Sequence, residues 1–129
     1  MIDTKHLLQQ AIDLNASDLH LVVGVPPTVR IEGELRTLAD AGILTPELNA
    51  EAIKQVLTTD QIERLTVNKE IDFSLNFSEK ARFRVNAYTQ KGSLAAAFRR
   101  IPLDIPEIDN LGLPQIVRTF TTLRQGLIL

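Results

Sequence analysis

Residues 81–102 constrain the fold more than any other part of the chain, because they have the pattern of one long β-hairpin. The segment ARFRVNAYTQKGSLAAAFRRIP alternates its side chains on both sides of Lys91-Gly92, a dipeptide suited to a two-residue turn. With that turn, opposed residues have numbers that sum to a constant, so Arg84 faces Arg99. A bulge or a longer loop would shift the register by one residue and separate the pair.

The two faces of this hairpin are expected to differ in character. Side chains alternate across a strand, so one face carries the apolar set Phe83, Val85, Ala87, Leu94, Ala96 and Phe98. The opposite face carries Arg82, Arg84, Asn86, Tyr88, Ala95, Ala97 and Arg99. We expect the first face to join the core and the second to be cationic and accessible.

The pairing of Arg84 with Arg99 needs a reason. Like charges that lie directly opposite destabilise a sheet by up to about 1 kcal/mol, so folding alone does not favour this pairing. Planar guanidinium groups donate two-pronged hydrogen bonds to phosphate or carboxylate oxygens, so an anion site is one interpretation. The other is ordinary surface arginines whose stems pack over apolar neighbours. Arg100 continues the apolar face, and we expect its head to reach solvent or to pair with an acidic residue.

The rest of the chain mixes helices and strands without a repeating βαβ rhythm. Apolar spacing predicts a helix in 4–16 and two short helices in 45–69, with one or two more in 108–120. Alternation and turn residues predict strands in 17–23, 28–31, 35–38 and 71–78. Strands that follow one another along the chain and are covered by helices make an α+β domain with an antiparallel sheet.

Composition limits the classes of function. A chain of 129 residues, 44% of them hydrophobic, fits one domain. Its net charge of -2 argues against a general binder of nucleic acid or acidic membranes, so any cationic function must be local. Cysteine is absent, which leaves the cytoplasm as the default compartment. The sequence also lacks an apolar run approaching the ~18 residues of a membrane span.

Other candidate sites are weaker. His20 and Asp18 share a strand face, but two histidines far apart in sequence and no cysteine argue against a metal site, so we expect none. Glu70 and Asp72 resemble a carboxylate pair, yet Asp72 alternates with apolar neighbours as a solvated strand residue does. The loop 24–27 has too few glycines, and no following Lys-Ser/Thr, to cradle a phosphate.

Three segments carry a resemblance to a known family: ASDLHLVVGVPPTVRIEGELRTL at 16–38, ARFRVNAYTQKGSLAAAFRRIP at 81–102 and LGLPQIVRTFTTLRQGLIL at 111–129. They resemble the N-terminal domain of the type IV pilus retraction ATPases, in the type II/IV secretion ATPase superfamily. The segment Ser17–Leu21 with Gly24, Pro26-Pro27, Arg30 and Gly33 favours this branch over the assembly and type II secretion ATPases. The resemblance implies a PAS-like fold over 1–125, an antiparallel sheet with helices packed on it. It also implies that 126–129 begin a C-terminal P-loop ATPase domain that lies outside this chain.

The resemblance also implies a function. Members of this family are homo-hexameric cytoplasmic motors at the cytoplasmic face of the inner membrane, which hydrolyse ATP with Mg²⁺ to drive pilus retraction and twitching motility. Their N-terminal domain packs on the neighbouring subunit's C-terminal ATPase domain, with nucleotide between the two, and the motor meets an inner-membrane pilus platform protein rather than nucleic acid. Two arginines of that domain reach the nucleotide phosphates, and the matching positions here are Arg84 and Arg99. The chain alone is expected to hold no nucleotide tightly and to hydrolyse none, because the Walker motifs are missing from it.

Two alternatives remain open. The first is a stand-alone PAS-like sensor or anion-binding module, which the residues favour if the natural protein is no longer than this chain. The second is an RNA-binding domain that uses the arginine face. That face offers only Tyr88 for base stacking, which makes the RNA-binding alternative the weaker of the two.

Overall fold

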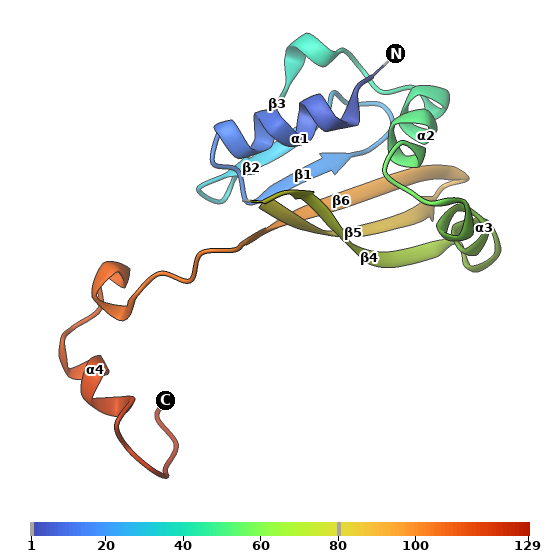
Figure 1. Ribbon diagram of the computed structural model, residues 1–129. Helices are drawn as coiled ribbons and strands as arrows, with labels where there is room; N and C mark the ends of the chain where they lie inside the picture. The colour runs from blue at the N-terminus through green and yellow to red at the C-terminus, as the bar shows by residue number, and fades with distance from the viewer. Residues whose placement is uncertain (1, 80) are drawn as a thin grey trace.

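A computed structural model describes residues 2–79 and 81–129. Its centre is a six-stranded antiparallel sheet with the strand order β3-β2-β1-β6-β5-β4 (Figure 1). The strands are β1 Asp18–Leu21, β2 Thr28–Ile31, β3 Glu34–Thr37, β4 Glu70–Ser78, β5 Ala81–Gln90 and β6 Ser93–Pro102. The helices are α1 Thr4–Asp13, α2 Pro46–Lys54, α3 Thr59–Asn68 and α4 Ile116–Phe120, with 3-10 turns η1 Ala39–Ala41 and η2 Ile108–Leu111. The predicted α+β class with an antiparallel sheet is therefore confirmed.

The hairpin of β5 and β6 has the register that the sequence predicts. Gln90 pairs with Ser93 and Arg84 pairs with Arg99. The turn residues Lys91 and Gly92 have φ values of 50° and 79°, which is the left-handed backbone that a two-residue hairpin turn requires. Each side chain of the hairpin therefore points to the face that the alternation assigns to it.

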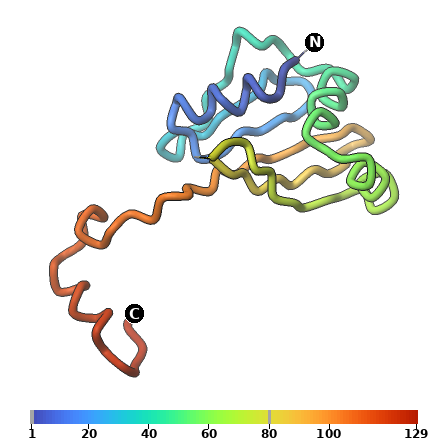
Figure 2. Tube along the Cα trace, viewed as in Figure 1, coloured from blue at the N-terminus to red at the C-terminus, as the bar shows by residue number. Residues whose placement is uncertain are grey.

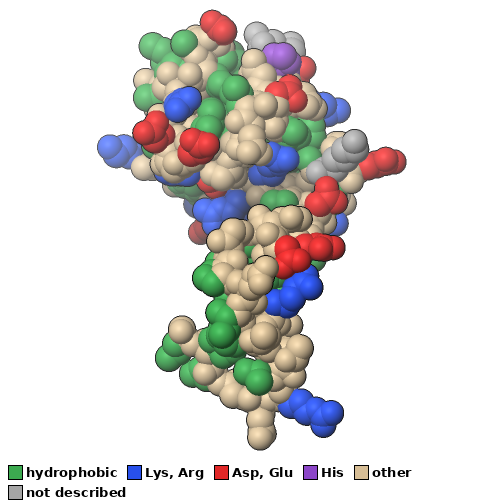
Figure 3. All heavy atoms as spheres, turned by 90° about the vertical axis from the view of Figure 1, so that its left-hand side faces the viewer, with side chains coloured by type: hydrophobic (Ala, Val, Ile, Leu, Met, Phe, Trp, Pro, Cys, Tyr) green, Lys and Arg blue, Asp and Glu red, His purple; other side chains and the backbone are tan. Residues whose placement is uncertain are grey.

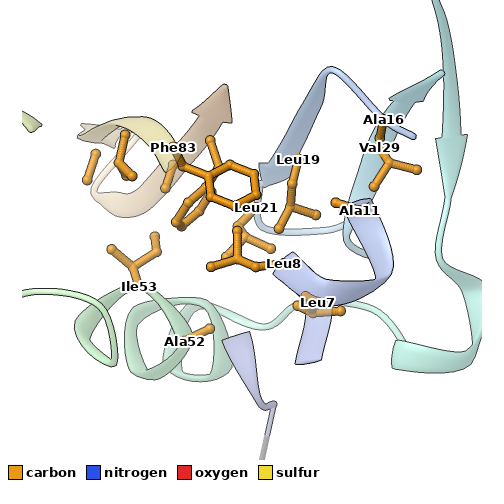
Figure 4. Packing of buried hydrophobic residues seen from close by; sticks show 14 of the residues in the cluster. Leu7, Leu8, Ala11, Ala16, Leu19, Leu21, Val29, Ala52, Ile53 and Phe83 are labelled. Carbon is orange, nitrogen blue, oxygen red and sulfur yellow. The ribbon is translucent and has the colours of Figure 1, made fainter. Parts of the chain in front are cut away.

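Helices cover one face of the sheet. The side chains of Leu8 from α1, Ile53 from α2 and Leu65 from α3 belong to the same buried cluster as Phe83 and Phe98 from the sheet. Figure 4 shows the labelled side chains of α1, α2 and the strands pointing toward one another in this layer. Alternating burial along β5, with buried positions separated by exposed or partly buried ones, shows that the opposite face of the sheet is uncovered.

Alternation in residues 71–78 also predicts that Phe73 and Leu75 are buried, and this part of the core prediction needs correction. The side chains of Phe83, Val85 and Phe98 are at most 1% exposed, as expected. Phe73 and Leu75 of β4 also point toward the helices, but they are only partly buried. The reason is the position of β4 at the edge of the sheet, where no further strand lies beside it.

Local capping fixes where the first and third helices begin. Asp3 caps α1, and its Oδ1 accepts hydrogen bonds from the backbone N–H groups of Lys5 and His6 at 2.9 and 3.3 Å. Thr58 and Gln61 form a reciprocal capping box at the start of α3. The helix itself begins at Thr59.

The chain leaves the sheet after Pro102, and its last segment lies apart from the helix-covered body (Figures 1 and 2). Many of its apolar side chains are exposed, as the space-filling view shows (Figure 3), among them Ile105 at 92% and Leu127 at 81%. Residues 126–129, predicted to begin a further domain, have no regular secondary structure. None of the helices in the described ranges is long and apolar enough to cross a membrane.

Candidate functional site

The uncovered face of the sheet brings the candidate residues together. Strand pairing places Asp18 of β1, Arg99 of β6 and Arg84 of β5 in one row across three neighbouring strands. The next row runs from His20 through Ala97 and Asn86 to Asp72 on β4. We call the part of the sheet surface formed by these two rows the open face.

Arg84 and Arg99 are neighbours on this accessible face, as the sequence predicts, but each of them has a carboxylate partner. Nε of Arg99 donates to Oδ1 of Asp18 at 3.1 Å. Arg84 holds Asp72 two-pronged, through Nε at 3.1 and 3.2 Å and through Nη2 at 3.0 Å. The arginine side chains remain 75% and 66% exposed, so a ligand from solvent can reach them.

These ion pairs correct the expectation that folding gives no reason for two arginines to lie opposite each other. In the structure Asp18 and Asp72 flank the pair, so negative charge on β1 and β4 compensates the repulsion between β6 and β5. The arginine pair is therefore compatible with folding in the absence of any anion.

Asp18 is the buried member of this network. Its side chain is only 10% exposed, and it accepts a hydrogen bond from Oγ of Ser17 at 2.7 Å in addition to the bond from Arg99. Nε of Arg30 on β2 lies 3.7 Å from Oδ2. Burial raises the pKa of Asp18, but the hydrogen bonds from Ser17 and Arg99, with the charges of Arg99 and His20, outweigh it and hold the pKa below its ordinary value. The carboxylate therefore stays ionised at neutral pH and links three strands.

Asp72 and Arg84 form a more exposed pair. The hydrogen bond from Arg84, together with its charge, lowers the pKa of Asp72. The same hydrogen bond and the charge of Asp72 raise the pKa of Arg84. The prediction that Asp72 is a solvated strand residue is confirmed, since its side chain is 44% exposed. Glu70 does not act with Asp72 as a carboxylate pair, because its Oε1 accepts from Nδ2 of Asn86 at 2.9 Å.

A hollow of about 200 Å³ lies in the open face. Ala97 sits in its row between His20 and Asn86, and its short side chain leaves space that a longer one would fill. Guanidinium groups border this space, so the hollow suits an oxyanion. The residues that line it are Asp18, His20, Arg84, Asn86, Ala97 and Arg99.

Two other arginines of the hairpin lie outside the hollow. Arg82 shares the open side of β5, and its Nε donates to Oδ1 of Asn76 at 2.9 Å. Arg100 points toward the other side, where Nη1 donates to Oδ1 of Asn15 at 3.1 Å. The expected partner of Arg100 was solvent or an acidic residue, so the amide of Asn15 is a correction. Within residues 2–79 and 81–129 there is also no cluster of three metal-ligating side chains.

The comparison with curated proteins finds two type IV pilus ATPases and a twitching motility protein. The chain is 31% identical over 128 residues to the type IV pilus retraction ATPase PilT of Pseudomonas aeruginosa, covering 99% of this chain and 37% of the relative. It is 28% identical over 128 residues to the type IV pilus ATPase PilU of the same organism, covering 99% and 33%. A twitching motility protein of Neisseria gonorrhoeae is 32% identical over 107 residues, covering 80% and 27%. The chain therefore spans about a third of the length of these relatives. No family model matches the chain.

The comparison with solved structures agrees. The pilus retraction motor PilT, crystallised with bound ADP, superposes with a TM-score of 0.78 and 40% identity over 91% of this chain and 34% of that one. The chain is an N-terminal domain of the secretion ATPase family. The ATPase DotB of Legionella pneumophila shares the fold of this secretion ATPase domain, with a TM-score of 0.74 and 23% identity over 92% of this chain and 35% of that one. The six-stranded sheet with helices on one face matches the corresponding domain of PilT.

Proposed function

We propose that this domain is part of an ATP-hydrolysing motor that retracts type IV pili, and that Arg84 and Arg99 contact the phosphates of its nucleotide. The observation that supports the proposal most directly is their position opposite each other on the open face, with both side chains more than half exposed. This arrangement belongs to a domain that resembles PilT, a motor crystallised with ADP. The two arginines also occupy the positions that the family resemblance assigns to phosphate contact.

The ion pairs determine which N–H groups of each arginine remain free to bind a phosphate. The contact with Asp18 uses Nε of Arg99, so the terminal amino groups of Arg99 remain for phosphate oxygens. Asp72 occupies Nε and one N–H of Nη2 of Arg84, so Nη1 and the second N–H of Nη2 remain for phosphate oxygens. Guanidinium groups held at a phosphoryl group stabilise the negative charge that develops during its transfer. We assign this role to Arg84 and Arg99.

We propose further that the open face meets the ATPase domain of a neighbouring subunit in a homo-hexamer at the cytoplasmic face of the inner membrane, with a pilus platform protein as a further partner. The uncovered sheet surface and the exposed apolar side chains of 103–129 support an interface of this kind. Residues 1–125 would form the N-terminal domain and 126–129 the start of a P-loop domain. ATP and Mg²⁺ would be held mainly by loop amides and a lysine of that P-loop domain.

Sequencing the natural gene past the codon for Leu129 tests this proposal. We expect the codons for a Gly-x-x-x-x-Gly-Lys-Ser/Thr loop to follow within a short distance, because that loop cradles phosphates in P-loop enzymes. A stop codon in its place would contradict the motor proposal.

A stand-alone anion-binding or sensor module is the second candidate. It is supported by one feature of the site, namely that both arginines and the hollow beside them lie within this chain. An RNA-binding function has less support, because Tyr88 is the single aromatic residue on the uncovered side of the described strands and it is partly buried.

A further inference from the structure

His20 lines the hollow beside the two arginines, and the proposed phosphate contact does not involve it. It lies on β1, opposite Ala97 of β6 on one side and Thr28 of β2 on the other. Because Ala97 is short, the imidazole of His20 borders the same space as the guanidinium groups of Arg84 and Arg99.

The imidazole is also incompletely satisfied. Nε2 of His20 is buried and has no hydrogen-bond partner among the described residues. Buried polar atoms in folded proteins are nearly always paired, so an unpaired ring nitrogen on a residue that lines a hollow makes that imidazole a candidate for ligand contact.

Burial, with the charges of two arginines, holds the pKa of His20 below its ordinary value and favours the neutral ring at neutral pH. Burial lowers its pKa, Asp18 on the same strand raises it, and the charges of Arg30 on β2 and Arg99 on β6 lower it again. Arg84 of β5, paired with Asp72 of β4, faces the hollow from the far side. An anion among these cations would reverse the balance in favour of the protonated ring.

We propose that His20 is a third ligand-binding side chain of this site, and that the hollow above Ala97 receives a phosphoryl-type oxyanion whose charge favours a proton on His20. This inference rests on the proposed phosphate contact of Arg84 and Arg99. It adds that anion binding takes up a proton. Since the bound state then holds the proton more tightly than the free state, affinity is highest below both pKa values of His20 and falls as the pH rises through them.

Sulfate is a suitable probe, because it keeps its double charge over the whole range in which histidine titrates. The chain would be titrated with sodium sulfate at constant ionic strength, near about pH 5.5 and about pH 7.5, while NMR follows both imidazoles. We expect saturating sulfate to raise the pKa of His20 by about one unit, so that binding tightens several-fold at the lower pH, toward the roughly tenfold limit that such a shift allows. The signals of His6, which is exposed on α1, serve as an internal reference and should stay in place.

Matched variants separate the contribution of the His20 imidazole to sulfate binding from the contribution of the hollow above Ala97. His20→Gln should keep sulfate binding near about pH 7.5 and lose the gain in affinity at low pH, whereas His6→Gln should keep that gain. Ala97→Val fills the hollow with a residue that suits a strand, and it should weaken sulfate binding about tenfold at both pH values. The NMR spectrum of each variant reports whether it is folded.

The arginine variants test the proposed function separately. Arg84→Ala and Arg99→Ala should weaken sulfate binding at both pH values. If they do so while sulfate leaves the pKa of His20 unchanged, the inference about His20 is wrong and the arginine contact stands. If sulfate still raises the pKa of His20 in both arginine variants, the role of His20 is supported and the arginine contact is contradicted. Sulfate binding that leaves the titration of His20 unchanged overturns the inference whatever the arginine variants do.

Discussion

Replacing Asp18 with asparagine removes the one buried carboxylate of the open face while keeping the size of the side chain. Asp18 accepts from Ser17 at 2.7 Å and from Arg99 at 3.1 Å, and it is 10% exposed. We expect Asp18→Asn to destabilise the domain, because Arg99 and Arg30 lose the negative charge that compensates them.

The magnitude follows from the burial of the two partners. A hydrogen bond to a charged group contributes about 1.5–3 kcal/mol when shielded, and an exposed ion pair contributes about 0.2–1 kcal/mol. Asp18 is shielded but Arg99 is 75% exposed, so an intermediate value applies. We expect the free energy of unfolding to fall by about 1–2 kcal/mol at neutral pH, which lowers Tm by roughly 4–8 °C.

Chemical denaturation of both proteins at several pH values checks this prediction. The pKa of Asp18 is held below its ordinary value, so its contribution is complete above about pH 4 and is lost as the pH falls through the pKa of the folded state. The difference between wild type and Asp18→Asn should therefore shrink in acid. Asp72→Asn is the matched control and should have a smaller effect, because that pair is solvent-exposed. Equal stability of wild type and Asp18→Asn at neutral pH would refute the reasoning.

Three further predictions concern the stability of the fold and the ATPase activity of the chain alone. Phe98→Ala should lower the free energy of unfolding by about 3–5 kcal/mol in a urea titration, because Phe98 is fully buried in the cluster. Gly92→Val should cost about 1–2 kcal/mol in the same measurement, since Gly92 has a φ of 79°, whereas Gly92→Asn should cost less. The chain alone should release phosphate from ATP no faster than buffer, because it contains no Gly-x-x-x-x-Gly-Lys-Ser/Thr loop, and turnover by a clean preparation would contradict this.

The sequence predicts the β5–β6 hairpin well because the information is local. The dipeptide Lys91-Gly92 selects the turn, and alternation on both sides selects the faces, so the pairing of Arg84 with Arg99 follows without knowledge of the rest of the chain. The same local rules identify the helix in 4–16 and the two short helices in 45–69.

The partners of the arginines depend on strand order, which no local pattern specifies. Asp18 meets Arg99 because β1 lies beside β6, although the two residues are 81 positions apart. Asp72 was on the predicted open side of β4, but its diagonal contact with Arg84 depends on the pairing of β4 with β5. The partial burial of Phe73 has the same origin, because a strand pattern does not tell an edge strand from a central one.

Steady-state ATP hydrolysis by the full protein encoded by the natural gene tests the central claim most directly. Arg84→Ala should lower kcat by about 10²–10³, because charge on the transferring phosphoryl group loses a stabilising guanidinium. Arg84→Lys should recover only part of the rate, since lysine lacks the planar fork. Arg82→Ala, an exposed neighbour on the same strand face, is the matched control and should stay within a few-fold of wild type. Wild-type hydrolysis by a folded Arg84→Ala protein would contradict the account and leave Arg84 and Asp72 as a surface ion pair.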